Sequence, residues 1–185
     1  GIQALEEPAG THDKETGEWP SKLGYALRDV FARTFGVWRE GEGGRDVVFD
    51  VIFPRGTRLP APGGPPLEAR RAYSPAHNVG HFRYLEASHL DQAGQPTGDI
   101  AVWDEVRFPL DPTLAGREHL DGAAVERSDA VAHQEIEERY ACHATGALAV
   151  TIENLTARYE RRYTLGRWAA RSAVVSPRGR AGRRR

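Results

Sequence analysis

The pattern that most constrains the fold of this chain is a series of short segments in which apolar and polar residues alternate. Three of them follow one another toward the C-terminal end: QEIEERYACHA, ALAVTIENL and TARYERRYTLG. In the first, Ile136, Tyr140 and Cys142 fall on one face of an extended chain. A period of two residues is that of a β-strand with one buried face. The three segments therefore predict an antiparallel three-strand meander.

Similar segments upstream predict five more strands. They lie at about 27–39, 47–53, 68–74, 79–87 and 99–110. Many of their residues are β-branched or aromatic, as is typical of strands. The sequence shows neither a long helical pattern nor the alternation of strands and crossover helices. About eight such strands predict an all-β fold, in which two antiparallel sheets pack as a β-sandwich.

Loops rich in glycine, proline and polar residues separate these strands. They lie at 40–45, 54–60, 61–66, 89–98 and 111–131, with a short helical turn expected near 114–120. The turn PRGTRLP at 54–60 is expected to be structural: it ends a strand, with Gly56 at positive φ. Within the strands, Phe82 and Tyr84 should share one face. The same alternation places Ile100, Val102, Val106 and Phe108 together on one face.

The two ends of the chain differ from its middle. Residues 1–26 are polar and lack a period, which predicts a disordered lead-in or linker before a sandwich domain at 27–166. Residues 167–185 hold seven arginines and no acid, so residues 1–166 carry a net charge of −8, against −1 for the whole chain. Blocks of like charge are usually disordered, and disorder is the expectation for this segment.

Several features bear on the compartment. The single cysteine, Cys142, excludes a disulfide within the chain, no run of eighteen apolar residues could span a membrane, and residues 1–25 lack the apolar core of a signal peptide. These features predict a cytoplasmic location. A chain that begins at Gly1 and contains no methionine is also predicted to be a fragment of a longer protein.

The sequence contains no known catalytic motif. Phosphate-binding glycine loops, a nucleophile elbow and the zinc-protease helix are all missing. Acidic residues are plentiful at Asp99, Asp104, Glu105, Glu135, Glu137 and Glu138, and they are expected on exposed strand faces. The chain is therefore predicted not to be an enzyme.

Two groups of residues have side chains that could bind a metal ion. His77 and His81 are four residues apart, which separates them by about 13 Å along an extended strand. His133, Cys142 and His143 form the second group, in which the parity of Cys142 predicts a core position. Neither spacing supplies a third ligand, so no metal site is predicted.

The order of four stretches resembles a known family. They are LRDVFARTFGVWREGEGG, VIFPRGTRLP, AYSPAHNVGHFRYLEAS and QEIEERYACHATGALAVTIENLTARYERRYTL. Together they are similar to the peptide-binding β-sandwich of the 70-kilodalton heat-shock chaperones, the DnaK-like family, over about residues 27–165. PRGTRLP is the most specific part of the resemblance.

The resemblance implies that the domain binds extended, partly hydrophobic polypeptide segments in a groove, through main-chain hydrogen bonds and an apolar pocket. The candidate peptide-binding residues that it implies are Val37, Trp38, Arg39, Ala76, Phe82 and Tyr84. Plain sandwich core is the alternative for Phe82 and Tyr84. No cofactor is expected in this chain, since ATP and Mg²⁺ are implied only for an ATPase domain upstream.

The chain departs from the family pattern in three places. Trp38, Arg39 and Glu40 replace an acid followed by small or apolar groove residues. GDIAVWDEVRFPLDP is longer and more charged than the corresponding segment of the family. The helical lid of the family would follow Leu165, where this chain has its Arg-rich segment, which predicts a lidless fragment.

Two alternatives stay open. Trp19, Trp38 and Trp103 could form an aromatic platform for a carbohydrate-binding sandwich. The Arg-rich segment could contact nucleic acid, and such binding would depend strongly on salt. Since a block of like charge is usually just a disordered segment, nucleic acid is an unlikely partner.

Overall fold

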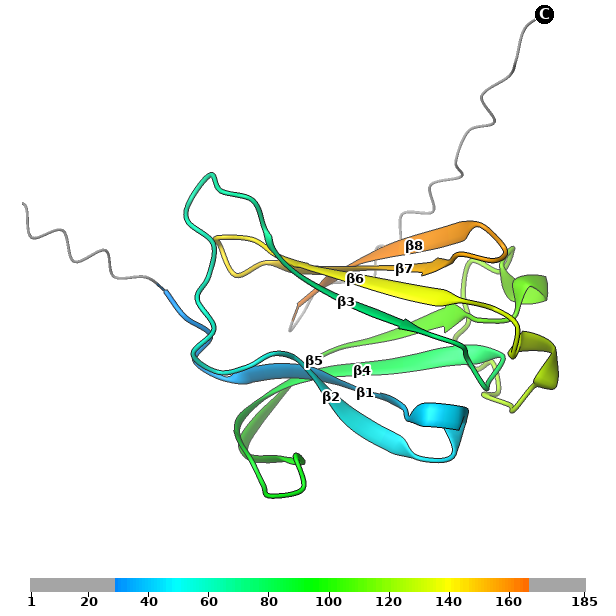
Figure 1. Cartoon of the computed structure of the whole chain (residues 1–185), viewed down its shortest axis with the longest axis horizontal. Helices are drawn as coiled ribbons and strands as arrows, with labels where there is room; N and C mark the ends of the chain where they lie inside the picture. The colour runs from blue at the N-terminus through cyan, green and yellow to red at the C-terminus, as the bar shows by residue number, and fades with distance from the viewer. Residues whose placement is uncertain (1–28, 167–185) are drawn as a thin grey trace, which may run out of the picture.

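The computed structural model describes residues 29–166 and shows two β-sheets packed face to face (Figure 1). The strands are β1 (Thr34–Glu40), β2 (Val47–Phe53), β3 (Leu67–Tyr73), β4 (Val79–Leu90), β5 (Pro96–Pro109), β6 (Ile136–Cys142), β7 (Leu148–Asn154) and β8 (Tyr159–Leu165). Short 3₁₀ turns lie between them at η1 (Glu42–Gly44), η2 (Pro112–Leu114) and η3 (Asp129–Val131). The expected lead-in at 1–26 and the Arg-rich segment at 167–185 lie outside the described residues.

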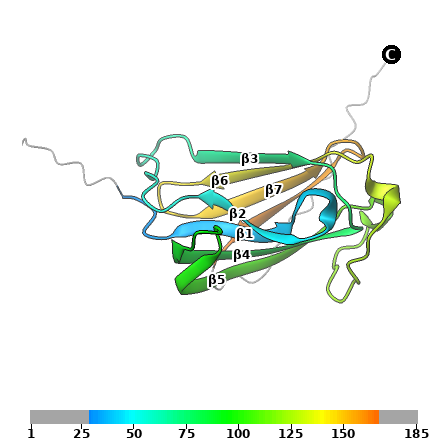
Figure 2. The ribbon, with the colours of Figure 1, turned by 60° about the horizontal axis from the view of Figure 1, so that its bottom comes forward.

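The strands form two four-stranded sheets. One has the order β2-β1-β4-β5 and the other β3-β6-β7-β8, and all neighbouring strands are antiparallel. Figure 2 shows the two layers from another side. The predicted all-β sandwich of about eight strands is confirmed for the described residues, and so is the meander, which is β6-β7-β8.

The core lies between the sheets, where inward side chains alternate along each strand. Ile136, Tyr140 and Cys142 are at most 1% exposed, as the two-residue period predicts. Phe82 and Tyr84 are also buried together. Other members of the core are Phe35, Val37, Ile52, Phe53, Val106, Phe108, Leu110, Leu148, Val150, Ile152 and Leu165.

Strand β5 changes face at Trp103. At this point the ladder between β4 and β5 has one residue more on β5, and Trp103 lies opposite no residue of β4; a second irregularity lies between Thr97 and Ile100. Such a β-bulge shifts the alternation by one position. The prediction of one shared face is therefore wrong: Val106 and Phe108 are buried in the core, whereas Ile100 is 49% and Val102 is 70% exposed.

The turn PRGTRLP is tied to the segment that precedes β1. The main chain of Phe31 donates to the carbonyl of Thr57 (2.9 Å) and accepts from the N–H of Gly56 (2.8 Å). The N–H of Leu59 donates to the carbonyl of Asp29 (2.9 Å). Gly56 has φ of 82°, as predicted. The turn therefore ends β2 and also holds the incoming chain in place.

Three predicted boundaries are wrong. The first strand begins at Thr34 rather than near 27, because residues 29–31 pair with the turn instead of with β4. The helical turn lies at 112–114 rather than 114–120, because the Asp111 side chain caps it by accepting from the N–H of Thr113 (2.8 Å). Strands β4 and β5 extend into the predicted 89–98 turn and leave only 91–95 between them.

Candidate functional site

Three loops meet at one end of the sandwich: the β1–β2 loop (41–46), the β3–β4 loop (74–78) and the end of the β5–β6 connection (121–128). A guanidinium nitrogen of Arg127 donates to the carbonyl of Gly43 (2.9 Å). The N–H of Ser128 donates to the carbonyl of Ala76 (3.0 Å). These contacts place loops that are distant in sequence next to one another.

Glu40, the last residue of β1, links the first two loops. Its carboxylate accepts from the N–H of Ala76 (3.2 Å) and contacts Nδ1 of His77. The approach requires a glycine at position 44, where φ is 63° and a Cβ would lie 2.5 Å from the Cβ of Ala76. Ala76, a candidate peptide-binding residue, thus holds the two loops together through its main chain.

The loops enclose a pocket of about 280 Å³, called here the loop-end pocket. Its floor is apolar and consists of Val79, Phe82 and Leu110. Two exposed valines stand at its rim: Val47 is 56% and Val125 is 43% exposed. The rest of the rim is polar, with Glu40, Arg45, Asp46, His77, His81 and Arg83.

The six candidate peptide-binding residues separate into distinct environments. Arg39 and Phe82 line the loop-end pocket. Val37 and Tyr84 are fully buried between the sheets, so their side chains belong to the core and face no pocket. The alternative of plain core therefore describes Tyr84, while Phe82 serves both core and pocket.

The described tryptophans do not form a shared platform. Trp38, which is also a candidate peptide-binding residue, packs against Phe49 with ring centroids 5.6 Å apart. Trp103 packs edge-on against the buried ring of Phe35 at 5.2 Å. Trp19 lies outside the described residues. Carbohydrate binding stays a prediction, without the flat aromatic surface that Trp38 and Trp103 would have to supply.

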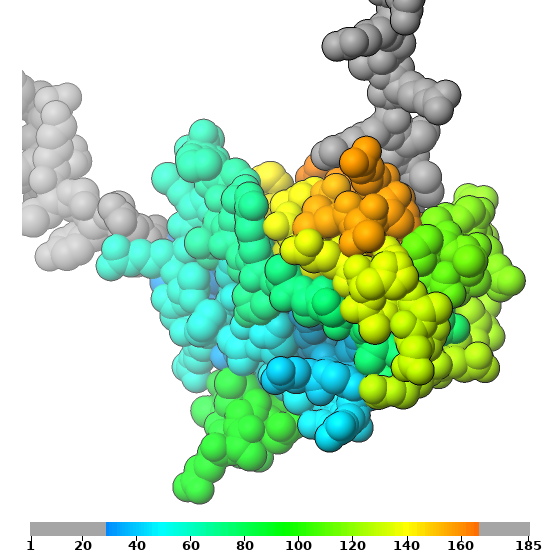
Figure 3. Space-filling view, turned by 45° about the vertical axis from the view of Figure 1, so that its right-hand side comes forward, coloured from blue at the N-terminus to red at the C-terminus, as the bar shows by residue number. Residues whose placement is uncertain are grey.

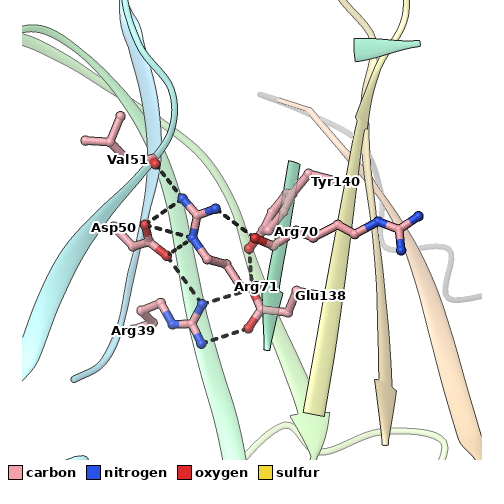
Figure 4. A network of polar contacts seen from close by, with 7 residues as sticks. All are labelled: Arg39, Asp50, Val51, Arg70, Arg71, Glu138 and Tyr140. Carbon is pink, nitrogen blue, oxygen red and sulfur yellow. Dashed lines mark hydrogen bonds and ion pairs between the residues drawn. The ribbon is translucent and has the colours of Figure 1, made fainter. Parts of the chain in front are cut away.

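A network of charged side chains crosses between the sheets beside the pocket, as Figure 4 shows. The guanidinium of Arg39, from β1, contacts both carboxylate oxygens of Glu138, from β6, at 3.1 and 3.3 Å. Arg71, from β3, contacts Asp50, from β2, through Nε (2.9 Å) and a terminal nitrogen (3.0 Å). Each sheet thus supplies one arginine and one acid, and each pair spans the two sheets.

The two pairs are joined, and the pair of Arg39 and Glu138 is shielded from water. Arg39 also lies 3.4 Å from the carboxylate of Asp50, which connects the pairs into one network. Tyr140 donates its hydroxyl to Glu138 (2.5 Å), and the Arg39 guanidinium lies 4.2 Å from the centre of the Tyr73 ring, a cation–π contact. Because every carboxylate here has a guanidinium partner, the network is suited to holding the sheets together rather than to acid–base chemistry.

Burial controls the ionisation of these groups. Desolvation raises the pKa of Glu138, whose side chain is fully enclosed, and the charge of Arg39 opposes that rise only in part. Burial also raises the pKa of Tyr73, Tyr84 and Tyr140 well above their usual range. The three hydroxyls therefore stay protonated at neutral pH.

The raised pKa of Glu138 predicts a pH dependence of stability. The folded state binds the proton more tightly than the unfolded state, so this group's contribution is fully present below its ordinary pKa of 4.5 and is lost as pH rises through the folded-state pKa. Glu138→Gln removes that titration. Urea denaturation measures the unfolding free energy of the wild type and of Glu138→Gln at each pH. We expect the value for the wild type minus the value for the variant to fall as pH rises. A difference that rises with pH would contradict the assignment.

The burial of Glu138 corrects one prediction. The acids were expected on exposed strand faces, and Glu138 is 0% exposed. The signal was present in the sequence, because Glu138 has the same parity as Ile136 and Tyr140, which were placed in the core. An acid at an inward strand position indicates a buried partner of opposite charge.

The first pair of histidines considered as metal ligands, His77 and His81, has carboxylate partners. His77 contacts Glu40, and Nε2 of His81 lies 2.7 Å from the carboxylate of Glu105. Cys142 is buried, as parity predicted, and burial raises the pKa of its thiol. Within residues 29–166, no group of three or more histidine, cysteine, aspartate or glutamate side chains is arranged to hold a metal ion.

No protein-family model matches this chain, and a search of the curated proteins returns no match. Within the described residues, no helix has the length and apolar character that crossing a membrane requires.

Proposed function

We propose that the domain binds an extended, partly hydrophobic polypeptide segment, with one side chain of the segment in the loop-end pocket. The observation that carries the proposal is the exposed apolar pair Val47 and Val125 at the rim of a pocket where three loops meet, above the buried side chains of Val79, Phe82 and Leu110. Sites that enclose a whole small molecule have roughly 300–1,000 Å³. The loop-end pocket, at about 280 Å³, lies at the lower end of this range and has room for a large apolar side chain.

The polar rim supports the same ligand. Arg45 and Arg83 are exposed beside the pocket and can donate to the carbonyl groups of a bound main chain. Main-chain hydrogen bonds with a pocket for one side chain are a recurring mode of peptide recognition. Binding residues also often lie on loops that a rigid scaffold holds in position, as the two sheets do here. The resemblance to the DnaK-like chaperones points to the same class of ligand, the substrate of a divergent chaperone.

The test is fluorescence anisotropy with short labelled peptides that differ only in a central leucine or glycine. We expect the leucine peptide to bind more tightly. Val125→Asp should weaken that binding about tenfold or more, because the ligand would then bury a charge against an apolar side chain. Val125 is 43% exposed, so the change should leave the fold intact.

Val30→Asp is the matched control. Val30 is 47% exposed and does not line the pocket, so its substitution should leave the peptide affinity unchanged. No binding of either peptide by folded wild type would reject the proposal. If both substitutions weakened peptide binding equally, the loop-end pocket would not be the binding site.

A further inference from the structure

The outer faces of the two sheets differ in chemistry. The face of β3-β6-β7-β8 is charged, with Arg139 at its centre in contact with Glu137 (2.8 Å), Glu153 (2.8 Å) and Glu160 (2.9 Å). A solvated polar face is usual for an antiparallel sheet that packs its other face on a core. The second sheet also has charged residues on its outer face, among them Arg83 and Glu105, but an apolar row lies beside them.

The outer face of β2-β1-β4-β5 carries an apolar row across all four strands. In register, Val102 pairs with Leu85, Leu85 with Gly36, and Gly36 with Val51. Paired residues of antiparallel strands lie on the same face. The ring of Phe49 covers Gly36, since a Cβ there would lie 2.5 Å from the Phe49 Cζ. The row ends at Val102, which is 70% exposed, on the edge strand β5.

The part of β5 that carries Val102 is an open edge. Near its C-terminal end, β5 accepts hydrogen bonds from Tyr159 and Tyr163 of β8. Residues 100–103 make no hydrogen bond to any described residue outside β4. The end of the hairpin that joins β4 and β5, drawn in green, also projects from the body of the molecule (Figures 1 and 3). An unpaired edge with exposed apolar side chains is a template for another strand.

We propose that two copies of the domain pair through this edge, antiparallel and centred on Ala101. In this arrangement Ile100 of each copy lies opposite Val102 of the other, and Asp99 lies opposite Trp103. The two apolar rows then join into one, across a continuous eight-stranded sheet. An interface of this kind is isologous, so a single surface suffices for both partners.

Other registers fit less well. A shift by one residue turns the exposed apolar side chains of one copy to the opposite face. Centring the pair on Val102 places Asp99 opposite Glu105, which sets like charges against each other. Centring it on Ile100 places Val102 opposite Gly98, which offers no side chain.

The test is sedimentation velocity of the whole chain over a concentration series. We expect the wild type to shift from monomer to dimer as concentration rises. Ile100→Lys and Val102→Glu should each weaken the dimer about tenfold or more. An equal mixture of the two variants should restore association, because the new lysine then faces the new glutamate while the unchanged Ile100 and Val102 still meet.

Val48→Lys is the control, since Val48 is 37% exposed on β2 and outside the proposed contact. It should dimerise like the wild type. Circular dichroism and thermal unfolding would verify that all variants fold. A wild type that stays monomeric at all concentrations would overturn the proposal, and so would a dimer that neither substitution weakens. Failure of the mixture to associate would overturn the register.

Discussion

Arg39→Met should lower the free energy of unfolding by about 3–5 kcal/mol, because it leaves Glu138 as a buried charge without its partner. Glu138 is 0% exposed, and Arg39 is its guanidinium partner at 3.1 Å. Urea denaturation monitored by circular dichroism at pH 7 measures the loss. The urea concentration at the midpoint of unfolding should fall, while the slope of the unfolding free energy against urea concentration should stay the same, since the fold is unchanged.

Two variants serve as comparisons for that result. Arg70→Met makes the same change in an exposed pair with Glu68 at 3.9 Å, where both side chains are at least 60% exposed. It should change stability by less than about 0.5 kcal/mol. The double variant Arg39→Met with Glu138→Leu should recover most of the loss, because no unpaired charge remains. If Arg39→Met costs no more than Arg70→Met, the cross-sheet network does not stabilise the fold.

Phe108→Ala should cost about 3–5 kcal/mol, the usual range for removing a buried aromatic ring from a core. Phe108 is 0% exposed, and its ring stacks on Tyr159 with centroids 5.6 Å apart. That stack joins β5 of one sheet to β8 of the other, on the opposite side of the sandwich from the charged network. The same denaturation experiment measures the loss.

Phe49→Ala is the matched control for the aromatic substitution. Phe49 is only partly buried and packs against Trp38 on the outer face of its sheet. Less surface is removed from water at that site, so the loss should be clearly smaller than for Phe108→Ala. If Phe49→Ala lowered the free energy of unfolding more than Phe108→Ala does, packing on the outer face would contribute more to stability than the core between the sheets.

The fold could be predicted from the sequence because its signals are local. Alternation in QEIEERYACHA depends only on neighbouring residues, and it placed Ile136, Tyr140 and Cys142 in the core. The glycine of PRGTRLP likewise predicted a positive φ from its own chemistry. Such patterns indicate strands and turns regardless of what they pack against.

Features that depend on partners distant in sequence could not be predicted in the same way. The bulge at Trp103 exists only in the register between β4 and β5, and nothing in the β5 sequence marks the residue that lacks a partner. The contact between Arg39 and Glu138 joins positions 99 residues apart. Alternation could place both residues inward, but only the packing of the sheets makes them neighbours.

The candidate site stays a prediction, and the candidate residues fall in two segments, β1 and the stretch from Ala76 to Tyr84. Both segments contribute residues to the loop-end pocket. Of the candidate residues, Arg39 and Phe82 line it, whereas Val37 and Tyr84 are core. The third contributor, around Val125, was missed because it lies in a long polar connection without a period.

The bulge at Trp103 has a consequence for how this domain would diverge among homologues. Loss of that single residue would make the ladder regular between Tyr84 and Leu85. Ile100 and Val102 would still point outward, because each would keep its partner on β4. A homologue that keeps a residue at position 103 but pairs it without a bulge would instead turn Ile100 and Val102 toward the core. A gap of one position at Trp103 would therefore mark a homologue that preserves the apolar outer edge.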